Sequence, residues 1–231
     1  MVSSRTVKIH KIKMSEEPEA YKIGWVPFMH AKIWLDSRPL IPRTETEFWT
    51  ERAIEEIKSI PNARVLDLCA GSGAIGVAVL KELPGVNVDF IEKEVRHHRT
   101  IEKNINTNLH ECDRMPRIFG GDLFESAQGP YDIILSNPPY IDPEKLERVQ
   151  DSVIEHEPRE ALMGGNAGME IVKRILADAP KYLASHGILY IEHEPEQVEE
   201  INKIVQSLPY SSCESFPDQY GVTRYSRLIR K

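Results

Sequence analysis

From residue 64 onward, short apolar runs alternate with amphipathic stretches along the chain. The apolar runs have the length and composition of buried strands, and they are Arg64–Leu68, Val86–Ile91, Arg117–Phe119, Tyr131–Leu135 and Gly187–Ile191. The intervening stretches read as helices, and they are Gly71–Lys81 (which opens with a glycine turn), Glu94–Asn106, Met169–Ala179 and Glu196–Leu208. Ser212–Phe216 and Val222–Ile229 then predict a closing antiparallel hairpin. This alternation predicts an α/β fold with a mostly parallel, doubly wound sheet of about seven strands.

The pattern is less regular before residue 64. Residues 21–39 hold short apolar stretches around turn-like breaks, which predicts a β-hairpin. A stiff connector with two prolines follows over residues 39–43, and Thr44 or Thr46 would then cap a helix. We therefore expect three parts: a loosely ordered segment over 1–18, a hairpin and connector over 19–47, and the main domain over 48–231.

Composition narrows the class of protein. The chain has 231 residues and no apolar run near the roughly 20 residues that span a bilayer, and its N-terminus lacks a signal-peptide core, so we expect a cytoplasmic protein. Its three cysteines, Cys69, Cys112 and Cys213, form no CxxC pair, and no HExxH occurs, so we expect no metal. The formal net charge of −7 favours a protein or small-molecule partner over a nucleic acid.

A glycine turn after the first of these strands predicts a nucleoside site. Gly71, Gly73 and Gly76 match G-x-G-x-x-G, and Glu92 ends the next strand, where it can accept two ribose hydroxyl protons. NAD, FAD and S-adenosylmethionine all fit this fingerprint. Asp67 can order the turn or meet a ligand ammonium, which suits an amino-acid-bearing cofactor better than a pyrophosphate. The candidate cofactor residues in this region are Asp67, Cys69, Ala70, Gly71, Ser72, Gly73 and Glu92.

Two further stretches follow later strands at the same predicted edge of the sheet. Asp122 can accept from an adenine amine while Leu123 or Phe124 covers the ring, although a turn-capping aspartate is the plain alternative. Asn137-Pro138-Pro139-Tyr140 forms a rigid corner that offers few donors. The Asn137 side-chain oxygen and the Pro138 carbonyl can each accept one proton of a planar NH2 group, with Tyr140 against its plane.

Together these residues resemble the Rossmann-like S-adenosylmethionine-dependent methyltransferases that carry N-P-P-Y. Leu40-Ile41-Pro42-Arg43-Thr44-Glu45-Thr46-Glu47 closely resembles the L-I-P-R-P-E-T-E signature of the release-factor glutamine methyltransferases, the HemK/PrmC family. Glu157-Pro158-Arg159-Glu160-Ala161-Leu162, followed by Gly164, Gly165 and Gly168, is similar to a second family segment.

The resemblance implies methyl transfer from S-adenosylmethionine to the side-chain N5 of a glutamine in the Gly-Gly-Gln loop of peptide-chain release factors. It implies catalytic roles for Asn137, Pro138, Pro139 and Tyr140, and cofactor contacts from Asn137 and the glycine turn. Cys69 stands where the family usually has glycine, and His156 where an aromatic residue is usual.

Family members usually carry a helical domain before the hairpin, and 39 residues precede Leu40. We therefore expect the catalytic domain to recognise a glutamine on a flexible loop by itself, with residues 19–47 and 140–165 as the rim of the site. Three alternatives stay open: methylation of an exocyclic amine on a nucleic-acid base, a non-catalytic binding protein, and a dinucleotide oxidoreductase.

Overall fold

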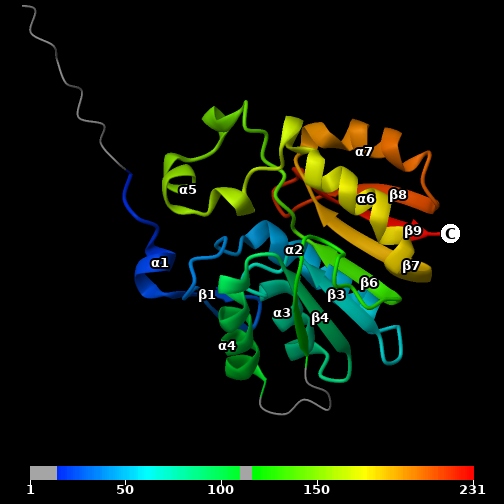
Figure 1. Ribbon diagram of the computed structural model, residues 1–231, viewed down its shortest axis with the longest axis horizontal. Coiled ribbons are helices and arrows are strands. Elements are labelled where there is room, and N and C mark those ends of the chain that lie inside the picture. The colour runs from blue at the N-terminus through cyan, green and yellow to red at the C-terminus, as the bar shows by residue number, and fades with distance from the viewer. Residues whose placement is uncertain (1–14, 110–115) are drawn as a thin grey trace, which may run out of the picture.

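A seven-stranded sheet forms the centre of the computed structural model, which describes residues 15–109 and 116–231 (Figure 1). Its strand order is β5-β4-β3-β6-β7-β9-β8. The strands are β3 (Arg64–Leu68), β4 (Asn87–Glu92), β5 (Arg117–Gly120), β6 (Tyr131–Ser136), β7 (Leu183–Glu192), β8 (Tyr210–Pro217) and β9 (Thr223–Arg230). Strands β3 to β7 are parallel, and β9 pairs antiparallel with β7 and β8. The predicted fold class and closing hairpin are confirmed.

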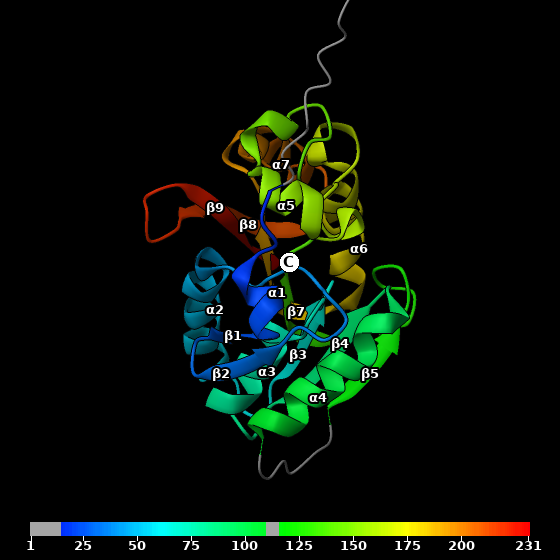
Figure 2. The ribbon, with the colours of Figure 1, turned by 90° about the vertical axis from the view of Figure 1, so that its left-hand side faces the viewer.

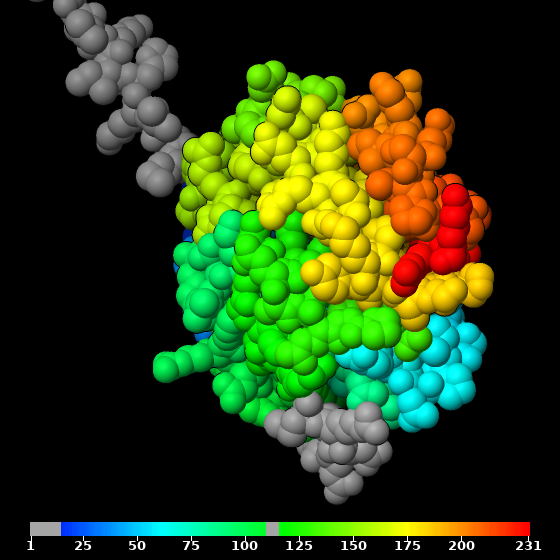
Figure 3. Space-filling view, turned by 45° about the vertical axis from the view of Figure 1, so that its right-hand side comes forward, coloured from blue at the N-terminus to red at the C-terminus, as the bar shows by residue number. Residues whose placement is uncertain are grey.

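Helices cover both faces of the sheet because side chains alternate along each strand. One face packs against α2 (Thr44–Ile57), α3 (Ala74–Glu82) and α4 (His98–Asn108). The other packs against α6 (Glu170–Tyr182) and α7 (Val198–Val205), which Figure 3 shows in yellow and orange. In β6, Ile133 and Leu135 point into the first layer while Ile134 points into the second.

The predicted hairpin forms from β1 (Trp25–Phe28) and β2 (Ala31–Trp34), with α1 (Glu19–Ile23) before it. Figure 2 shows α4 beside β2, and two asparagines of α4 hold β2 of the hairpin. Asn104 accepts from the Trp34 N–H (2.7 Å) and donates to the Trp34 carbonyl (3.0 Å). Asn108 bonds the Lys32 backbone in the same way. The hairpin is therefore fixed against the helix that follows β4.

Several local predictions were wrong. Helix α2 begins at Thr44 without a side-chain cap, because the Thr46 hydroxyl lies inside the helix and bonds a carboxylate elsewhere. Strand β7 starts four residues early because Leu183 pairs with Tyr131. The short helices α1 and α5 (Asp151–His156) were not predicted, because they hold too few residues for a periodic pattern to show. Five 3-10 turns complete the described elements: Val95–His97, Leu146–Arg148, Arg159–Ala161, Asn166–Gly168 and Pro195–Gln197.

In the described part of the chain, no helix is both long and apolar enough to cross a membrane. Cys112 and most of the segment 1–18 lie outside the described residues.

Candidate active site

The glycine turn between β3 and α3 has a backbone conformation that few residue types adopt. Cys69, Gly71 and Gly73 all have positive φ angles, of 62°, 56° and 77°. Glu92, at the end of β4, accepts the backbone N–H groups of Gly71 (2.7 Å) and Glu94 (2.8 Å). Burial raises the pKa of Glu92 above its ordinary value. Its carboxylate therefore ties the glycine turn to the neighbouring strand and keeps two unused acceptor positions.

Asp67 lies fully buried behind this turn. Its Oδ2 accepts the Gly76 N–H at 2.8 Å, whereas its Oδ1 has no hydrogen-bond partner among the described residues. Burial, with a contribution from the charge of Glu92, raises the pKa of Asp67 to about 8. An unpaired buried carboxylate oxygen is costly, and a cationic ligand group beside it would remove that cost.

We expect Asp67→Asn to change how stability depends on pH in the cofactor-free protein. The folded pKa is raised from 3.8 to about 8, so this group stabilises the fold below its unfolded pKa and loses that contribution as pH rises through the folded value. The free energy of unfolding of the wild type should therefore fall between about pH 5 and pH 8 by on the order of 1 kcal/mol per pH unit more than that of the variant. Urea denaturation at several pH values measures this.

The surface variant Asp178→Asn controls for the loss of one carboxylate. Parallel pH slopes for the wild type and Asp67→Asn would mean that Asp67 does not hold a proton in the folded state at neutral pH.

A cavity of about 270 Å³ opens beside the glycine turn at the carboxyl edge of the sheet. Most of the predicted cofactor residues line it: Cys69, Gly71, Glu92, Asp122, Leu123 and Asn137. Asp67, Ala70, Ser72 and Gly73 do not line it and instead shape the turn. The Gly73 N–H bonds the Ala70 carbonyl (2.7 Å), and Asn104 donates to the Ser72 carbonyl (2.9 Å). The same asparagine therefore fixes both the hairpin and the glycine turn.

Asp122 enters this cavity as one member of a charge cluster. Its carboxylate lies 2.8 Å from Arg174 and 3.5 Å from Lys93. Although partial burial opposes ionisation, the hydrogen bond and charge of Arg174 and the charge of Lys93 hold the pKa of Asp122 below its ordinary value. Leu123 follows with φ of 55° and is 6% exposed. This turn therefore presents an ionised carboxylate and an apolar surface side by side.

Asn137 lies in the wall between this cavity and a second one of about 290 Å³. Asn137, Leu40 and Ala161 line both cavities. Pro138 lines the second cavity and Pro139 the first. The rigid corner after β6 thus separates two chambers, and a group in one can meet a group in the other beside Asn137.

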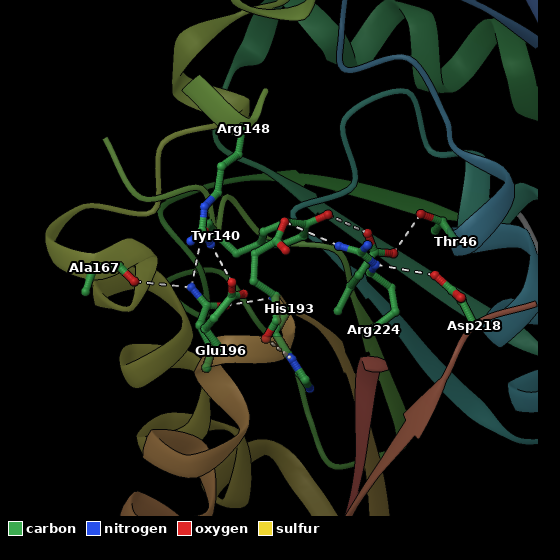
Figure 4. Close-up of polar contacts among 11 residues, drawn as sticks. Thr46, Tyr140, Arg148, Ala167, His193, Glu196, Asp218 and Arg224 are labelled. Atoms are coloured by element: carbon green, nitrogen blue, oxygen red, sulfur yellow. Dashed lines mark hydrogen bonds and ion pairs between the residues drawn. The ribbon is translucent and has the colours of Figure 1, made fainter. Parts of the chain in front are cut away.

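A buried carboxylate at the end of β7 organises the second cavity. Glu192 is 1% exposed and accepts hydrogen bonds from Thr46 (2.7 Å) and Trp49 (2.7 Å) of α2 and from the Tyr140 hydroxyl (2.8 Å). Thr46 in turn lies 3.1 Å from the side-chain nitrogen of Asn137. Burial raises the pKa of Glu192 above its ordinary value. In Figure 4, Thr46, Tyr140 and Arg224 reach this region from separate elements.

The two segments that resemble family signatures meet beside the second cavity. Glu157, which is 4% exposed, accepts the Ile41 N–H (2.9 Å) and the Arg43 guanidinium (2.5 Å). The connector before α2 is therefore clamped to the segment after Tyr140. Because Leu40, Arg43 and Glu45 line the second cavity, this clamp sets the position of one of its walls.

Glycines 164 and 168 pack directly behind the proline corner. A Cβ atom on Gly164 would lie 2.7 Å from the Pro139 carbonyl, and one on Gly168 would lie 2.0 Å from the Tyr140 carbonyl. Gln197 donates to that same Tyr140 carbonyl at 2.9 Å. Glycine is therefore required at both positions by the close approach of two backbones.

We expect Gly168→Ala to destabilise the fold by about 1–3 kcal/mol and to lower activity by moving Tyr140. The residue has φ of 69°, and the added methyl group would meet backbone rather than a flexible side chain. Thermal unfolding and a turnover assay on the same preparation measure the two effects. Gly85→Ala is the matched control, since none of the described residues has an atom within 4 Å of a Cβ atom there. Wild-type stability for Gly168→Ala would show that this segment does not buttress the corner.

A wider groove of about 510 Å³ continues from the second cavity past Tyr140, Arg148 and Arg224. Its formal charges cancel, because four acidic and four basic side chains line it. Each basic side chain pairs with a carboxylate: Lys145 with Asp142, Arg148 with Glu196, Lys173 with Glu200, and Arg224 with Glu194.

Sequence reasoning missed the Glu192 cluster and part of the first cavity wall. Glu192 follows the predicted strand Gly187–Ile191, so its place at the carboxyl edge of the sheet was available as a signal. Thr46 and Trp49 gave no such signal, because only the packing of α2 brings them to that edge. The missed residues that line the first cavity include His97, Met163 and Ile171.

Known proteins resemble the chain in sequence and in fold. Residues 48–166 match the family described as methyltransferase small domain. The release factor glutamine methyltransferase of Thermodesulfovibrio yellowstonii is 31% identical over 217 residues, which cover 92% of this chain and 76% of that protein. The protein of the same name from Coxiella burnetii is 32% identical over 214 residues, which cover 93% of this chain and 76% of that protein.

Solved structures share the fold at lower identity. The catalytic domain of hMettl16, in complex with a 3'UTR hairpin, has a TM-score of 0.66 at 17% identity, over 87% of this chain and 75% of that one. A methyltransferase from Pyrococcus furiosus has a TM-score of 0.57 at 18% identity, over 79% of this chain and 82% of that one. These similarities establish the fold alone.

The sheet order, the glycine turn and the acidic end of β4 define a class I methyltransferase with a Rossmann-like domain. Enzymes of this class take their methyl group from S-adenosylmethionine, which is therefore the cofactor. The chain belongs to the release factor glutamine methyltransferase family, as the identity and coverage of its curated relatives establish. The resemblance predicted from the sequence motifs is confirmed.

Proposed function

We propose that this chain transfers a methyl group from S-adenosylmethionine to the side-chain N5 of a protein glutamine, namely that of the Gly-Gly-Gln loop of peptide-chain release factors. The observation that carries the proposal is the position of Asn137 in the wall shared by two cavities. A methyl donor in the first and a carboxamide in the second would meet beside its side chain. The cytoplasm, where peptide chains are terminated, is then the site of the reaction.

The first cavity suits S-adenosylmethionine. Asp67 lies behind the glycine turn, where it would hold the turn through the Gly76 N–H and attract the ligand's ammonium group through its charge rather than by direct contact. Glu92 would accept the two ribose hydroxyls with the lone pairs that Gly71 and Glu94 leave unused. Leu123 would cover the adenine ring, with the Asp122 carboxylate near its exocyclic amine. When bound, the cofactor supplies an electrophilic methyl group.

The second cavity suits a primary carboxamide. An amide nitrogen is a poor nucleophile because its lone pair is conjugated with the carbonyl group. The Oδ1 of Asn137 and the carbonyl of Pro138 would accept its two N–H bonds and stabilise the positive charge that develops as nitrogen attacks carbon. Fixing the nitrogen in line with the methyl group supplies a further large part of the rate. The nitrogen then releases one proton to water, while Tyr140 packs against the amide plane.

The charge around the second cavity and the groove beyond it favours a protein over a nucleic acid as the methyl acceptor. The groove beyond Tyr140 has balanced formal charge, and each of its cations pairs with a carboxylate. Phosphate backbones are bound by surplus positive charge. The connector and the segment after Tyr140, which together contribute Leu40, Arg43, Val149 and Leu162 to the second cavity, would form the rim around a loop that presents glutamine.

Incubation with methyl-labelled S-adenosylmethionine and a purified peptide-chain release factor tests the proposal. We expect mass spectrometry to find one labelled methyl group on the glutamine of the Gly-Gly-Gln peptide. A release factor with that glutamine changed to glutamate is the control and should stay unlabelled. Label on total RNA or DNA, with none on the release factor, would overturn the proposal in favour of base methylation.

A further inference from the structure

Glu192, which lines the second cavity, is a buried carboxylate that accepts hydrogen bonds from three donors. Its Oε2 accepts from both the Thr46 hydroxyl and the Trp49 indole N–H, each at 2.7 Å, and its Oε1 accepts from the Tyr140 hydroxyl at 2.8 Å. An indole N–H can only donate. The oxygen that faces Trp49 therefore accepts, and the Thr46 hydroxyl beside it donates its proton to the same atom.

The direction in which Thr46 donates also decides how it bonds Asn137. A hydroxyl group has one proton, and that of Thr46 is used on Glu192. Toward Asn137, 3.1 Å away, Thr46 can only accept, so the Asn137 atom that faces it is the side-chain nitrogen. The side-chain oxygen is left without a partner among the described residues. A carboxamide turned around would set oxygen against oxygen and leave both unsatisfied.

We propose that Glu192 is a positioning residue that fixes, through Thr46, which end of the Asn137 carboxamide faces the second cavity. The cavity then presents an acceptor oxygen and selects groups that carry N–H donors, such as a primary carboxamide. This inference rests on the proposed function of Asn137 and deepens it. Trp49 sets the direction of these hydrogen bonds, because its indole N–H can only donate and so cannot reverse its bond to Glu192.

The proposal predicts that orientation matters more than the charge of residue 192. In Glu192→Gln, the Gln side-chain oxygen can still face Trp49 and Thr46, and only the bond to Tyr140 must reverse. In Glu192→Leu, Thr46 loses its acceptor and is free to donate to the Asn137 oxygen, which allows the carboxamide to turn. Thr46→Val removes the link itself, whereas Thr46→Ser keeps the hydroxyl.

The test measures kcat on the release factor and the Kd for S-adenosylmethionine. We expect Glu192→Leu and Thr46→Val to lower kcat at least about 30-fold with Kd changed less than about twofold. Glu192→Gln and Thr46→Ser should stay within about tenfold of the wild-type kcat. Glu56→Gln on α2 is the matched control, since Glu56 also accepts from a tyrosine, Tyr190, but lines neither cavity.

A double variant sharpens the test. Trp49→Phe alone keeps Thr46 bonded to Glu192, so its loss in kcat should be smaller than that of Glu192→Leu. Combined with Glu192→Gln, it lets the Gln carboxamide turn. The combined loss in kcat should exceed the product of the single losses by at least about threefold. Equal losses for Glu192→Gln and Glu192→Leu, or wild-type kcat for Glu192→Leu, would overturn the proposal.

A second readout needs no substrate. With ¹⁵N-labelled asparagine, the side-chain amide protons of Asn137, assigned by their absence in Asn137→Ala, should show contacts to the Thr46 side chain in wild type and not in Glu192→Leu. A wild type that fails to methylate release factors but shows this contact would count against the proposed function alone. Absence of the contact in the wild type would overturn the positioning role even where methylation occurs.

Discussion

Replacement of Asn137 by alanine is expected to lower kcat by at least about 100-fold, or about 2.7 kcal/mol of transition-state stabilisation. The residue lies in the wall between the two cavities, and its side-chain nitrogen is committed to Thr46. Its oxygen would therefore be the group that meets the attacking amide. Because that contact strengthens as charge develops, the loss should fall on kcat more than on substrate KM. Steady-state kinetics on the release factor measures the two constants.

The affinity for S-adenosylmethionine should stay within about threefold in Asn137→Ala, since most of the first cavity is built by other residues. Asn202→Ala, at an exposed position of α7, is the matched control for an asparagine-to-alanine change. Near-normal methylation by a folded Asn137→Ala protein would exclude Asn137 as the residue that orients the acceptor.

Replacement of Glu92 by alanine is expected to weaken S-adenosylmethionine binding by about 2–3 kcal/mol. Two effects act in the same direction. The ribose would lose its charged acceptor, and the Gly71 N–H would lose the partner that holds the glycine turn at 2.7 Å. Isothermal titration calorimetry measures the change in Kd, and thermal unfolding checks that the variant is folded.

Glu102→Ala, on the exposed side of α4, is the control for removal of one glutamate. An unchanged Kd in folded Glu92→Ala would mean that the cofactor ribose is held elsewhere.

Features that depend on short-range interactions could be predicted from the sequence, and features that depend on long-range contacts could not. Strands such as Arg64–Leu68 and Tyr131–Ser136 could be predicted because local apolar patterning sets which residues a sheet buries. The glycine turn could be predicted because its backbone conformation depends on residues adjacent in the chain. The capping of α2 could not, because Thr46 bonds a carboxylate 146 residues away.

By itself, the sequence determined the α/β class, the glycine turn, the acid that ends β4 and the rigid corner at Asn137–Tyr140, since each depends on short-range geometry or on a contiguous motif. Only the tertiary structure decided how these parts combine. Packing of α2 against the sheet brings Thr46 and Trp49 to Glu192, and the clamp from Glu157 brings Arg43 to the second cavity. Such contacts join residues more than 100 positions apart, and their partners follow from how whole elements pack.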